Sequence, residues 1–213
     1  SGTLPIPGVD ISVVDESGNE IPNNTKGYLV IRKPWPGMLL GLWKNDEKYK
    51  SVYWTKYPDC YYPGDYALKD DDGYLWLLGR ADDVLKIAGH RIGTAELESC
   101  IVSDECVSES AVCGIPDDVK GESIIAFVVL KNGLDIDENI LEKTIFNKIR
   151  IDIGPIATPK KIYFVKKLPK TRSGKIMRRL LKTIANGEHI GDTTTLDDVS
   201  AVNEIQKAVS HIS

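Results

Sequence analysis

A lysine in the segment Leu168–Ile176 is the residue best placed by its neighbours to do chemistry. The segment reads LPKTRSGKI, so Lys175 directly follows a Ser-Gly pair. A lysine on a glycine-bearing loop can bring a positive charge to a reacting anion and then withdraw, because glycine adopts the backbone conformations that a moving loop needs. A P-loop is excluded, since Pro169 stands where its first glycine belongs and Ile176 where serine or threonine would bind magnesium. We therefore interpret Lys175 as a catalytic residue.

Asp65 and Arg80 are a second candidate pair, suited to binding a sugar. Asp65 follows Gly64 in a turn after an aromatic run, where a carboxylate can accept hydrogen bonds from vicinal hydroxyls. The alternative is an aspartate that stabilises its own turn. Arg80 lies fifteen residues later, and its alternative role is a surface ion pair with Asp82 or Asp83, which contributes little to stability.

The segment Gly79–Arg91, GRADDVLKIAGHR, lies among apolar runs and has the composition of a joint. Tyr74–Leu78 predicts a buried strand before it, and Val84–Ile87 predicts a second, short strand within it. The residues between the two strands are too polar for a core. We therefore expect a connector that holds a ligand on one side and bends on the other.

From residue 1 to about residue 80, the sequence predicts a small, mostly antiparallel β unit. Short apolar alternations such as Val9–Val14 and Tyr28–Ile31 are separated by turn-forming Gly, Asn and Pro residues, a pattern typical of β-hairpins. A short helix capped by Asn45 or Asp46 is expected between the strands.

After the joint, helical and strand patterns alternate, which indicates an α+β unit with a three-stranded sheet and about three helices. Thr94 and Asp137 are the expected N-caps of two helices, and the third covers Lys175–Ala185. The tail from Gly187 onward is expected to run over the surface. The expected strands are Glu109–Ile115, Ser123–Leu130 and Lys161–Val165.

The composition is that of a soluble globular protein, with 42% apolar residues, 27% charged residues and a net charge of −4. The negative charge disfavours attraction of the whole chain to nucleic acid or to anionic membranes. There is no apolar run long enough to span a bilayer and no charged-then-apolar leader, so we expect a cytoplasmic protein with no membrane partner. The four cysteines include no C-x-x-C pair, which favours reduced thiols over a zinc site.

Residues 160–182 are strongly basic, with ten lysines or arginines and no acid. A nucleic-acid-binding domain can have this composition. However, the interleaved Ile162, Phe164 and Leu181 are typical of a core and not of a platform on which bases stack. We expect no nucleic-acid partner.

Three motifs follow one another along the chain: YPGD at Tyr62–Asp65, GRADDVLKIAGHR at Gly79–Arg91 and LPKTRSGKI at Leu168–Ile176. In this order and at this spacing, the sequence resembles the adenylate-forming acyl-CoA synthetases. The strings IGPIATP at 153–159 and GDTTTL at 191–196, together with the Gly-His-Arg of the second motif, narrow the resemblance to the AMP-forming acetyl-CoA or propionyl-CoA synthetase branch. The resemblance covers nearly the whole chain.

The resemblance implies a role for each candidate residue. Asp65 and Arg80 would contact the ribose of ATP, and Lys175 would supply charge while a carboxylate attacks the α-phosphate. Asp82 would be the hinge about which the C-terminal domain rotates between two half-reactions. Arg91 would approach the phosphates of ATP or the adenylate; its alternative is a salt bridge to Glu96 or Glu98.

The resemblance also implies a coenzyme A site at Ala88, Gly89 and Arg150. The branch often has a serine where this chain has Ala88, so any contact there must come from the backbone. Arg150 could otherwise be a solvated cation at a helix end. A further implied feature is a metal-associated turn in which main-chain carbonyls bind the ion. Its residues are Val102, Asp104 and Val107, with Asp104 where the family commonly has histidine.

The resemblance divides the chain into residues 1–81, the last β subdomain of the N-terminal domain, and residues 82–213, the mobile C-terminal domain. The family's phosphate loop and acyl pocket precede this region, so the chain would be the C-terminal portion of a synthetase and inactive alone. Its cofactors would be ATP, coenzyme A and Mg²⁺. Its partners would be the rest of the adenylation domain and a lysine acetyltransferase and deacetylase acting on Lys175. The alternatives are a CoA- or nucleotide-binding regulatory module without catalysis and a nucleic-acid-binding α+β domain.

Overall fold

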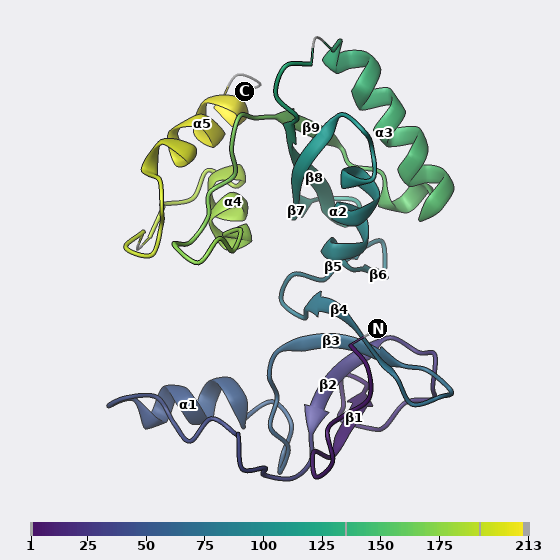
Figure 1. Ribbon diagram of the computed structural model, residues 1–213, viewed down its shortest axis with the longest axis vertical. Coiled ribbons are helices and arrows are strands. Elements are labelled where there is room, and N and C mark those ends of the chain that lie inside the picture. Colours follow the sequence, from purple (N-terminus) through teal and green to yellow (C-terminus); the bar gives the residue numbers. More distant parts are fainter. Residues whose placement is uncertain (1, 135, 192, 211–213) are drawn as a thin grey trace. The chain divides into compact units, whose positions relative to one another are not determined.

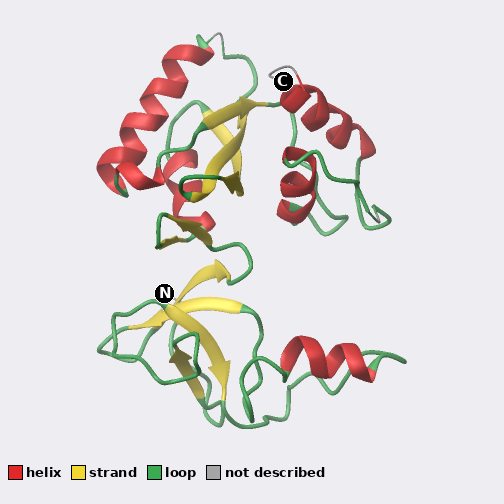
Figure 2. Cartoon of the chain, turned by 180° about the vertical axis from the view of Figure 1, so that it is seen from behind, coloured by secondary structure: helices red, strands yellow, loops and turns green. Residues whose placement is uncertain are grey.

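A computed structural model describes residues 2–134, 136–191 and 193–210 (Figure 1). The chain forms two compact units, Ser1–Val84 and Leu85–Ser213. The first unit is mostly strands and loops, and the second combines helices with a sheet (Figure 2). The α+β prediction is confirmed. The predicted boundary after residue 81, with a hinge at Asp82, stays a prediction.

The first unit is built on a four-stranded antiparallel sheet in the order β1-β2-β3-β4. Alternate residues of a strand point to opposite faces, and both faces are covered, so that Leu29 and Ile31 belong to one apolar cluster and Tyr28 and Val30 to another. Asn45 caps the one helix among the described residues of this unit by accepting from the Lys48 amide at 3.1 Å, as expected. The elements are β1 (Ile11–Val14), β2 (Gly27–Ile31), α1 (Asp46–Tyr53), β3 (Asp65–Lys69) and β4 (Leu75–Arg80).

The second unit has a five-stranded sheet, in which β5 and β7 pair antiparallel with β8 and β9 pairs parallel with it. The sheet is larger than the predicted three strands because a short hairpin joins it where Ile87 pairs with Gly121. The strands are β5 (Leu85–Ile87), β6 (His90–Ile92), β7 (Val107–Asp117), β8 (Gly121–Leu130) and β9 (Lys161–Phe164).

Helices cover both faces of this sheet (Figure 1). Ala126 and Val128 of β8 contact the cluster formed with α2 and α3, whereas Ile125 and Phe127 contact the cluster formed with α4 and α5. This explains why β8 is apolar without alternation. The helices are α2 (Thr94–Val102), α3 (Glu138–Asp152), α4 (Arg178–Ala185) and α5 (Val199–Ser210), with a short 3-10 helix, η1, at Pro155–Ala157.

Three local predictions are wrong. The strand predicted to be buried at Tyr74–Leu78 lies at Leu75–Arg80 and exposes Trp76 and Leu77. Thr94 is the first residue of α2 and not its cap, because the preceding Gly93 takes the cap position and Thr94 is buried. The tail does not simply run over the surface, because α5 buries Val202 and Ile205 in the core shared with α4. By contrast, Asp137 caps α3 as predicted and accepts from the Asn139 amide at 2.9 Å.

No helix in the described part of the chain combines the length and the apolar character needed to cross a membrane.

Candidate nucleotide and acyl-transfer site

In the first unit, the ends of β3 and β4 bring Asp65, Arg80 and Asp82 together. Asp65 and Arg80 face each other across the strand pair, and the Ala81 amide donates to the Gly64 carbonyl at 2.9 Å. The Nη1 atom of Arg80 lies 3.5 Å from Oδ1 of Asp65, and its Nε lies 3.2 Å from Oδ1 of Asp82. One guanidinium therefore lies between the two carboxylates.

The backbone beside Arg80 holds this guanidinium in place. Nη1 of Arg80 donates to the Pro63 carbonyl at 2.7 Å. Gly64 has a φ of +87°, and a Cβ built there would overlap the guanidinium, with Cζ only 2.8 Å away. Only glycine satisfies both conditions, which gives the Pro-Gly-Asp string of the sequence a physical reason.

Asp65 is half-buried, and burial raises the pKa of its carboxyl, while Arg80 opposes and Asp82 adds to the rise. Its environment differs from that of Asp70, which stabilises its own turn by accepting from the Tyr74 amide at 2.8 Å. In the described part of the chain, no backbone amide donates to the Asp65 carboxylate. Asp65 therefore retains acceptor capacity for hydroxyl groups.

In the second unit, Lys175 lies on a closed hairpin. Lys170 and Ile176 pair as antiparallel bridge partners, and the Thr171 amide donates to the Lys175 carbonyl at 2.9 Å. The Gly174 amide donates to the Thr171 carbonyl at 2.8 Å, and Gly174 has a φ of +81°, as a tight turn requires. The Lys175 side chain is exposed and forms no ion pair with any residue that the structure describes.

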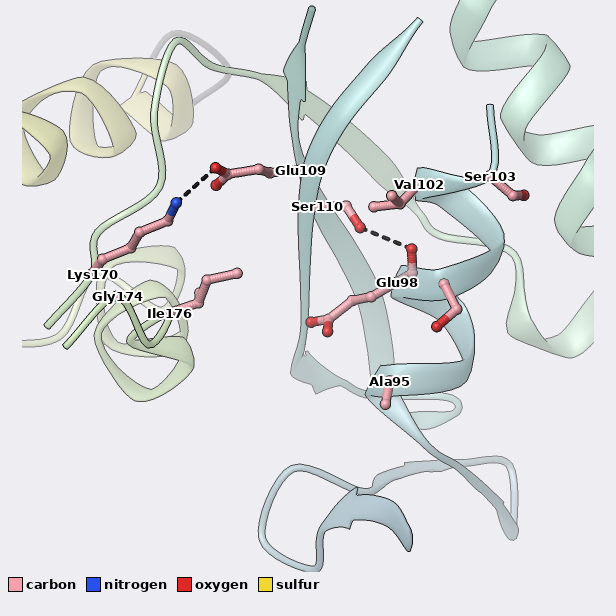
Figure 3. Close-up of a pocket in the computed structure, with 10 residues that line it drawn as sticks. Ala95, Glu98, Val102, Ser103, Glu109, Ser110, Lys170, Gly174 and Ile176 are labelled. Atoms are coloured by element: carbon pink, nitrogen blue, oxygen red, sulfur yellow. Dashed lines mark hydrogen bonds and ion pairs between the residues drawn. The ribbon is translucent and has the colours of Figure 1, made fainter. Parts of the chain in front are cut away.

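A cavity of about 590 Å³ lies between α2, the start of β7 and this hairpin (Figure 3). Two ion pairs flank it, one between Glu98 and Arg178 and one between Glu109 and Lys170. Neither pair follows from the sequence, in which Glu98 is only an alternative partner predicted for Arg91. The one signal in the sequence is the position of the acidic Glu98 beside the apolar residues Leu97 and Ile101 of α2. The lining residues are Ala95, Glu98, Ser99, Val102, Ser103, Glu109, Ser110, Lys170, Gly174 and Ile176.

The β5-β6 hairpin carries Ala88 and Gly89, predicted to contact coenzyme A, and Arg91, predicted to approach the ATP phosphates. Its two loop residues, Ala88 and Gly89, have φ angles of +46° and +83°, as a two-residue hairpin turn demands. The Ala88 amide donates to the Lys120 carbonyl at 2.9 Å, which fixes the turn to the β7-β8 connection. Arg91 is half-buried on β6 opposite Lys86.

A second cavity of about 340 Å³ connects this hairpin to the IGPIATP segment. Ile87 lines it from β5, and Pro155 and Ile156 line it from the segment. The hydroxyl of Thr158 is buried there and has no hydrogen-bond partner among the residues that the structure describes. Arg150 is exposed in the last turn of the preceding helix α3, where a cation complements the helix dipole.

The turn proposed for a metal ion uses oxygens of Asp104 for its own closure. The Asp104 carbonyl accepts from the Val107 amide at 3.2 Å, and its carboxylate accepts from the Cys106 amide at 2.9 Å. Among the described residues, no group of three or more His, Cys, Asp or Glu side chains could hold a metal ion. A carbonyl site at Val102, Asp104 and Val107 stays a prediction.

The basic run of residues 160–182 is largely neutralised within the fold. Cations of this run form ion pairs with acids elsewhere in the second unit. The pairs are Lys160 with Asp117, Lys161 with Glu142, Lys167 with Asp198, Lys170 with Glu109, Arg178 with Glu98 and Lys182 with Glu122. Six of the ten cations in this run therefore have an acidic partner within the fold.

The sequence of this chain is similar to a known domain family and to known synthetases. A family model described as the AMP-binding enzyme C-terminal domain matches residues 96–175. The chain is 57% identical over 208 residues to the acetyl-coenzyme A synthetase of Pyrobaculum arsenaticum, covering 98% of this chain and 31% of that protein. It is 50% identical over 211 residues to the 3-hydroxypropionyl-coenzyme A synthetase of Metallosphaera sedula, covering 98% and 32%.

A solved structure shares the fold. The acetoacetyl-CoA synthetase from Streptomyces lividans matches with a TM-score of 0.88 at 24% identity, over 99% of this chain and 32% of that one. The chain thus spans about a third of the length of the curated relatives it matches. Residues 96–175 match the model of the AMP-binding enzyme C-terminal domain, and nearly the whole chain is similar to about a third of acetyl-coenzyme A synthetases, which confirms the resemblance seen in its motifs.

Proposed function

We propose that this chain is the C-terminal portion of an AMP-forming acetyl-CoA synthetase, or of a synthetase for a closely similar short carboxylate. The complete enzyme would convert acetate and ATP to acetyl-adenylate and pyrophosphate, and then acetyl-adenylate and CoA to acetyl-CoA and AMP. The observation that carries the proposal is the exposed Lys175 on a hairpin of fixed shape, in a chain 57% identical to an acetyl-coenzyme A synthetase.

In the first half-reaction, a carboxylate oxygen attacks the α-phosphorus, a new O–P bond forms, and the bond to the pyrophosphate oxygen breaks. Negative charge accumulates as two anions meet, and the Lys175 ammonium would neutralise it. Asp65 would accept from the ribose hydroxyls while Arg80 fixes its orientation from 3.5 Å away. Arg91 would approach the phosphates, and magnesium would enter with ATP.

In the second half-reaction, the C-terminal domain would rotate at Asp82, withdraw Lys175 and present the β5-β6 hairpin. Asp82 is exposed, and its carboxylate contacts the guanidinium of Arg80. The CoA sulfur would then attack the acyl carbonyl and expel AMP. The backbone of Ala88 and Gly89 would line the path of CoA, and Arg150 would bind its phosphates.

The acyl group is assigned by similarity. Relatives include both acetyl- and 3-hydroxypropionyl-coenzyme A synthetases, at 57% and 50% identity. By the resemblance, the acyl pocket would lie in the part of the synthetase that precedes these residues, and that part would decide between the two acids. The remaining adenylation domain is therefore an obligatory partner of this chain.

Lys175 is also the proposed site of reversible acetylation by a lysine acetyltransferase and a deacetylase, in the cytoplasm. Acetylation removes the positive charge that adenylation needs. An acetylated enzyme would lose adenylation and retain thioester formation from supplied acetyl-adenylate. Equal loss in both half-reactions would contradict this assignment.

The proposal is tested by assaying the complete enzyme and the 213-residue chain side by side. With ATP and CoA, the complete enzyme should form an acyl-CoA from acetate, propionate or 3-hydroxypropionate, and the chain alone should form none. Turnover by the chain alone, or no turnover by the complete enzyme with any of the three acids, would overturn the proposal. Binding of CoA and nucleotide without turnover would favour a regulatory module.

A further inference from the structure

We propose that Glu98 and Glu109 are positioning residues that clamp the two ends of the Lys175 hairpin. Lys170 precedes the turn of the hairpin and Arg178 follows it, and each pairs with one of the two glutamates. This inference rests on the proposed function, since it concerns the aim of a catalytic lysine. Neither glutamate would touch substrate.

The stronger half of the clamp is the pair of Glu98 with Arg178. Nε of Arg178 lies 2.8 Å from Oε1 of Glu98, and Nη2 lies 2.6 Å from Oε2, so the contact is bidentate. The Glu98 side chain is only 11% exposed, and its Oε1 also accepts from the Val112 amide at 2.9 Å. The carboxylate is thus fixed to β7 of the central sheet before it binds Arg178, and its geometry leaves little freedom to the start of α4.

The second half of the clamp holds the other strand of the hairpin. Nζ of Lys170 lies 2.6 Å from Oε1 of Glu109, which lies on β7. Backbone bonds add to it, because the Asp197 amide donates to the Lys170 carbonyl at 2.9 Å and the Met177 amide donates to the Pro169 carbonyl at 2.9 Å.

Glu98, Glu109 and Lys170 line the cavity, and Figure 3 shows the ion pair of Glu109 and Lys170 joining β7 to the hairpin. The hairpin is a short loop whose tip carries a glycine at positive φ and would otherwise sample many directions. Two anchors, Glu98 on α2 and Glu109 on β7, restrict it to one direction. The clamp explains how a long, exposed lysine side chain can be aimed reproducibly at a phosphate.

The clamp is tested by hydrogen exchange on Glu98→Gln. Glutamine keeps an oxygen for the Val112 amide but loses the charge that binds Arg178. We expect the amides of Thr171 and Gly174 to exchange about tenfold faster, the loss expected of one charge-assisted bond. Glu142→Gln is the matched control, because Glu142 also accepts from a strand amide, at Ile162, and pairs with a lysine, but both partners lie on β9 and not on the hairpin. It should leave both hairpin amides unchanged.

Arg178→Lys is a second variant that keeps the charge and removes the bidentate geometry. It should accelerate exchange in the same two amides by a smaller factor. Unchanged exchange at Thr171 and Gly174 in both variants would overturn the clamp, as would equal acceleration throughout the second unit.

The functional arm uses the complete enzyme. Glu98→Gln should lower the adenylation rate about tenfold and leave thioester formation unchanged, and it should have no further effect on adenylation in a Lys175→Ala background. Additive losses would overturn the positioning role. If Lys175→Ala alone leaves adenylation intact, the proposed function fails, while the exchange measurement still decides whether the clamp exists.

Discussion

The guanidinium of Arg80 lies against Gly64, in the space that any side chain at that position would occupy. Gly64 also has a φ of +87°. The residue before Asp65 must therefore be glycine for Arg80 to reach both Asp65 and Asp82. This requirement explains why the YPGD motif and the GRADD motif occur together.

Gly64→Ala should therefore destabilise the first unit by about 2 to 3 kcal/mol, the combined cost of positive φ and of displacing Arg80. Gly8→Ala is the control, because Gly8 has a φ of +90° and nothing within 4 Å of an added Cβ. Denaturant unfolding of the two variants should show a larger loss for Gly64→Ala. Equal losses would mean that Arg80 moves aside without cost.

The pKa of Asp65 should lie above its ordinary value of 3.8, because burial disfavours the carboxylate. Arg80 opposes this shift, so Arg80→Gln should raise the pKa further. A raised pKa in the folded state means that Asp65 opposes folding as the pH rises through that pKa and the buried group ionises. Titration of the Asp65 carboxyl carbon by NMR in both proteins measures the shift. A lower pKa in Arg80→Gln would contradict the geometry.

Asp117 should make the second unit sensitive to acid. Hydrogen bonds from the Ser123 hydroxyl and from the Lys120 and Val119 amides lower the pKa of Asp117 to about 2. Its contribution to stability is therefore present above the unfolded pKa of 3.8 and is lost as the pH falls toward 2. Asp117→Asn should flatten the stability profile between pH 4 and pH 2. An unchanged slope in thermal unfolding would argue against these bonds.

Ala88→Gly should stabilise the second unit by about 0.5 to 1 kcal/mol. Ala88 has a φ of +46°, which is costly for any residue with a Cβ, and the gain is reduced because glycine has more freedom in the unfolded chain. Ala95→Gly, within α2, should have the opposite sign and cost about 1 kcal/mol. A loss of stability in Ala88→Gly would show that the turn depends on the methyl group.

Local patterns in the sequence predicted much of this fold. The strands β7, β8 and β9 and the cap at Asp137 follow from apolar runs and from turn or capping residues close by in the chain. The motif pair of Asp65 and Arg80 also proved to be neighbours across β3 and β4. Such features depend on residues within a few turns or one hairpin of each other.

The features that could not be predicted depend on contacts between distant segments. Glu98 and Arg178 are 80 residues apart, and nothing in either local sequence selects the partner. The helix α5 does have apolar residues at helical spacing, at Ala201, Val202 and Ile205, but the polar segment before it concealed the pattern. Thr94 was misassigned because a glycine cap leaves no side-chain signal.

The most direct test of the central claim is the ratio of the two half-reactions in Lys175→Ala of the complete enzyme. Acetate-dependent exchange of pyrophosphate into ATP reports adenylation, and acetyl-CoA formed from supplied acetyl-adenylate reports the second step. We predict a loss of about 10² to 10³ in the first and little change in the second, as for removal of one transition-state charge partner. Lys143→Ala is the control, because Lys143 is also exposed but lies on α3, and it should change the rate of neither half-reaction. Equal loss in both half-reactions, or full adenylation without Lys175, would contradict the account.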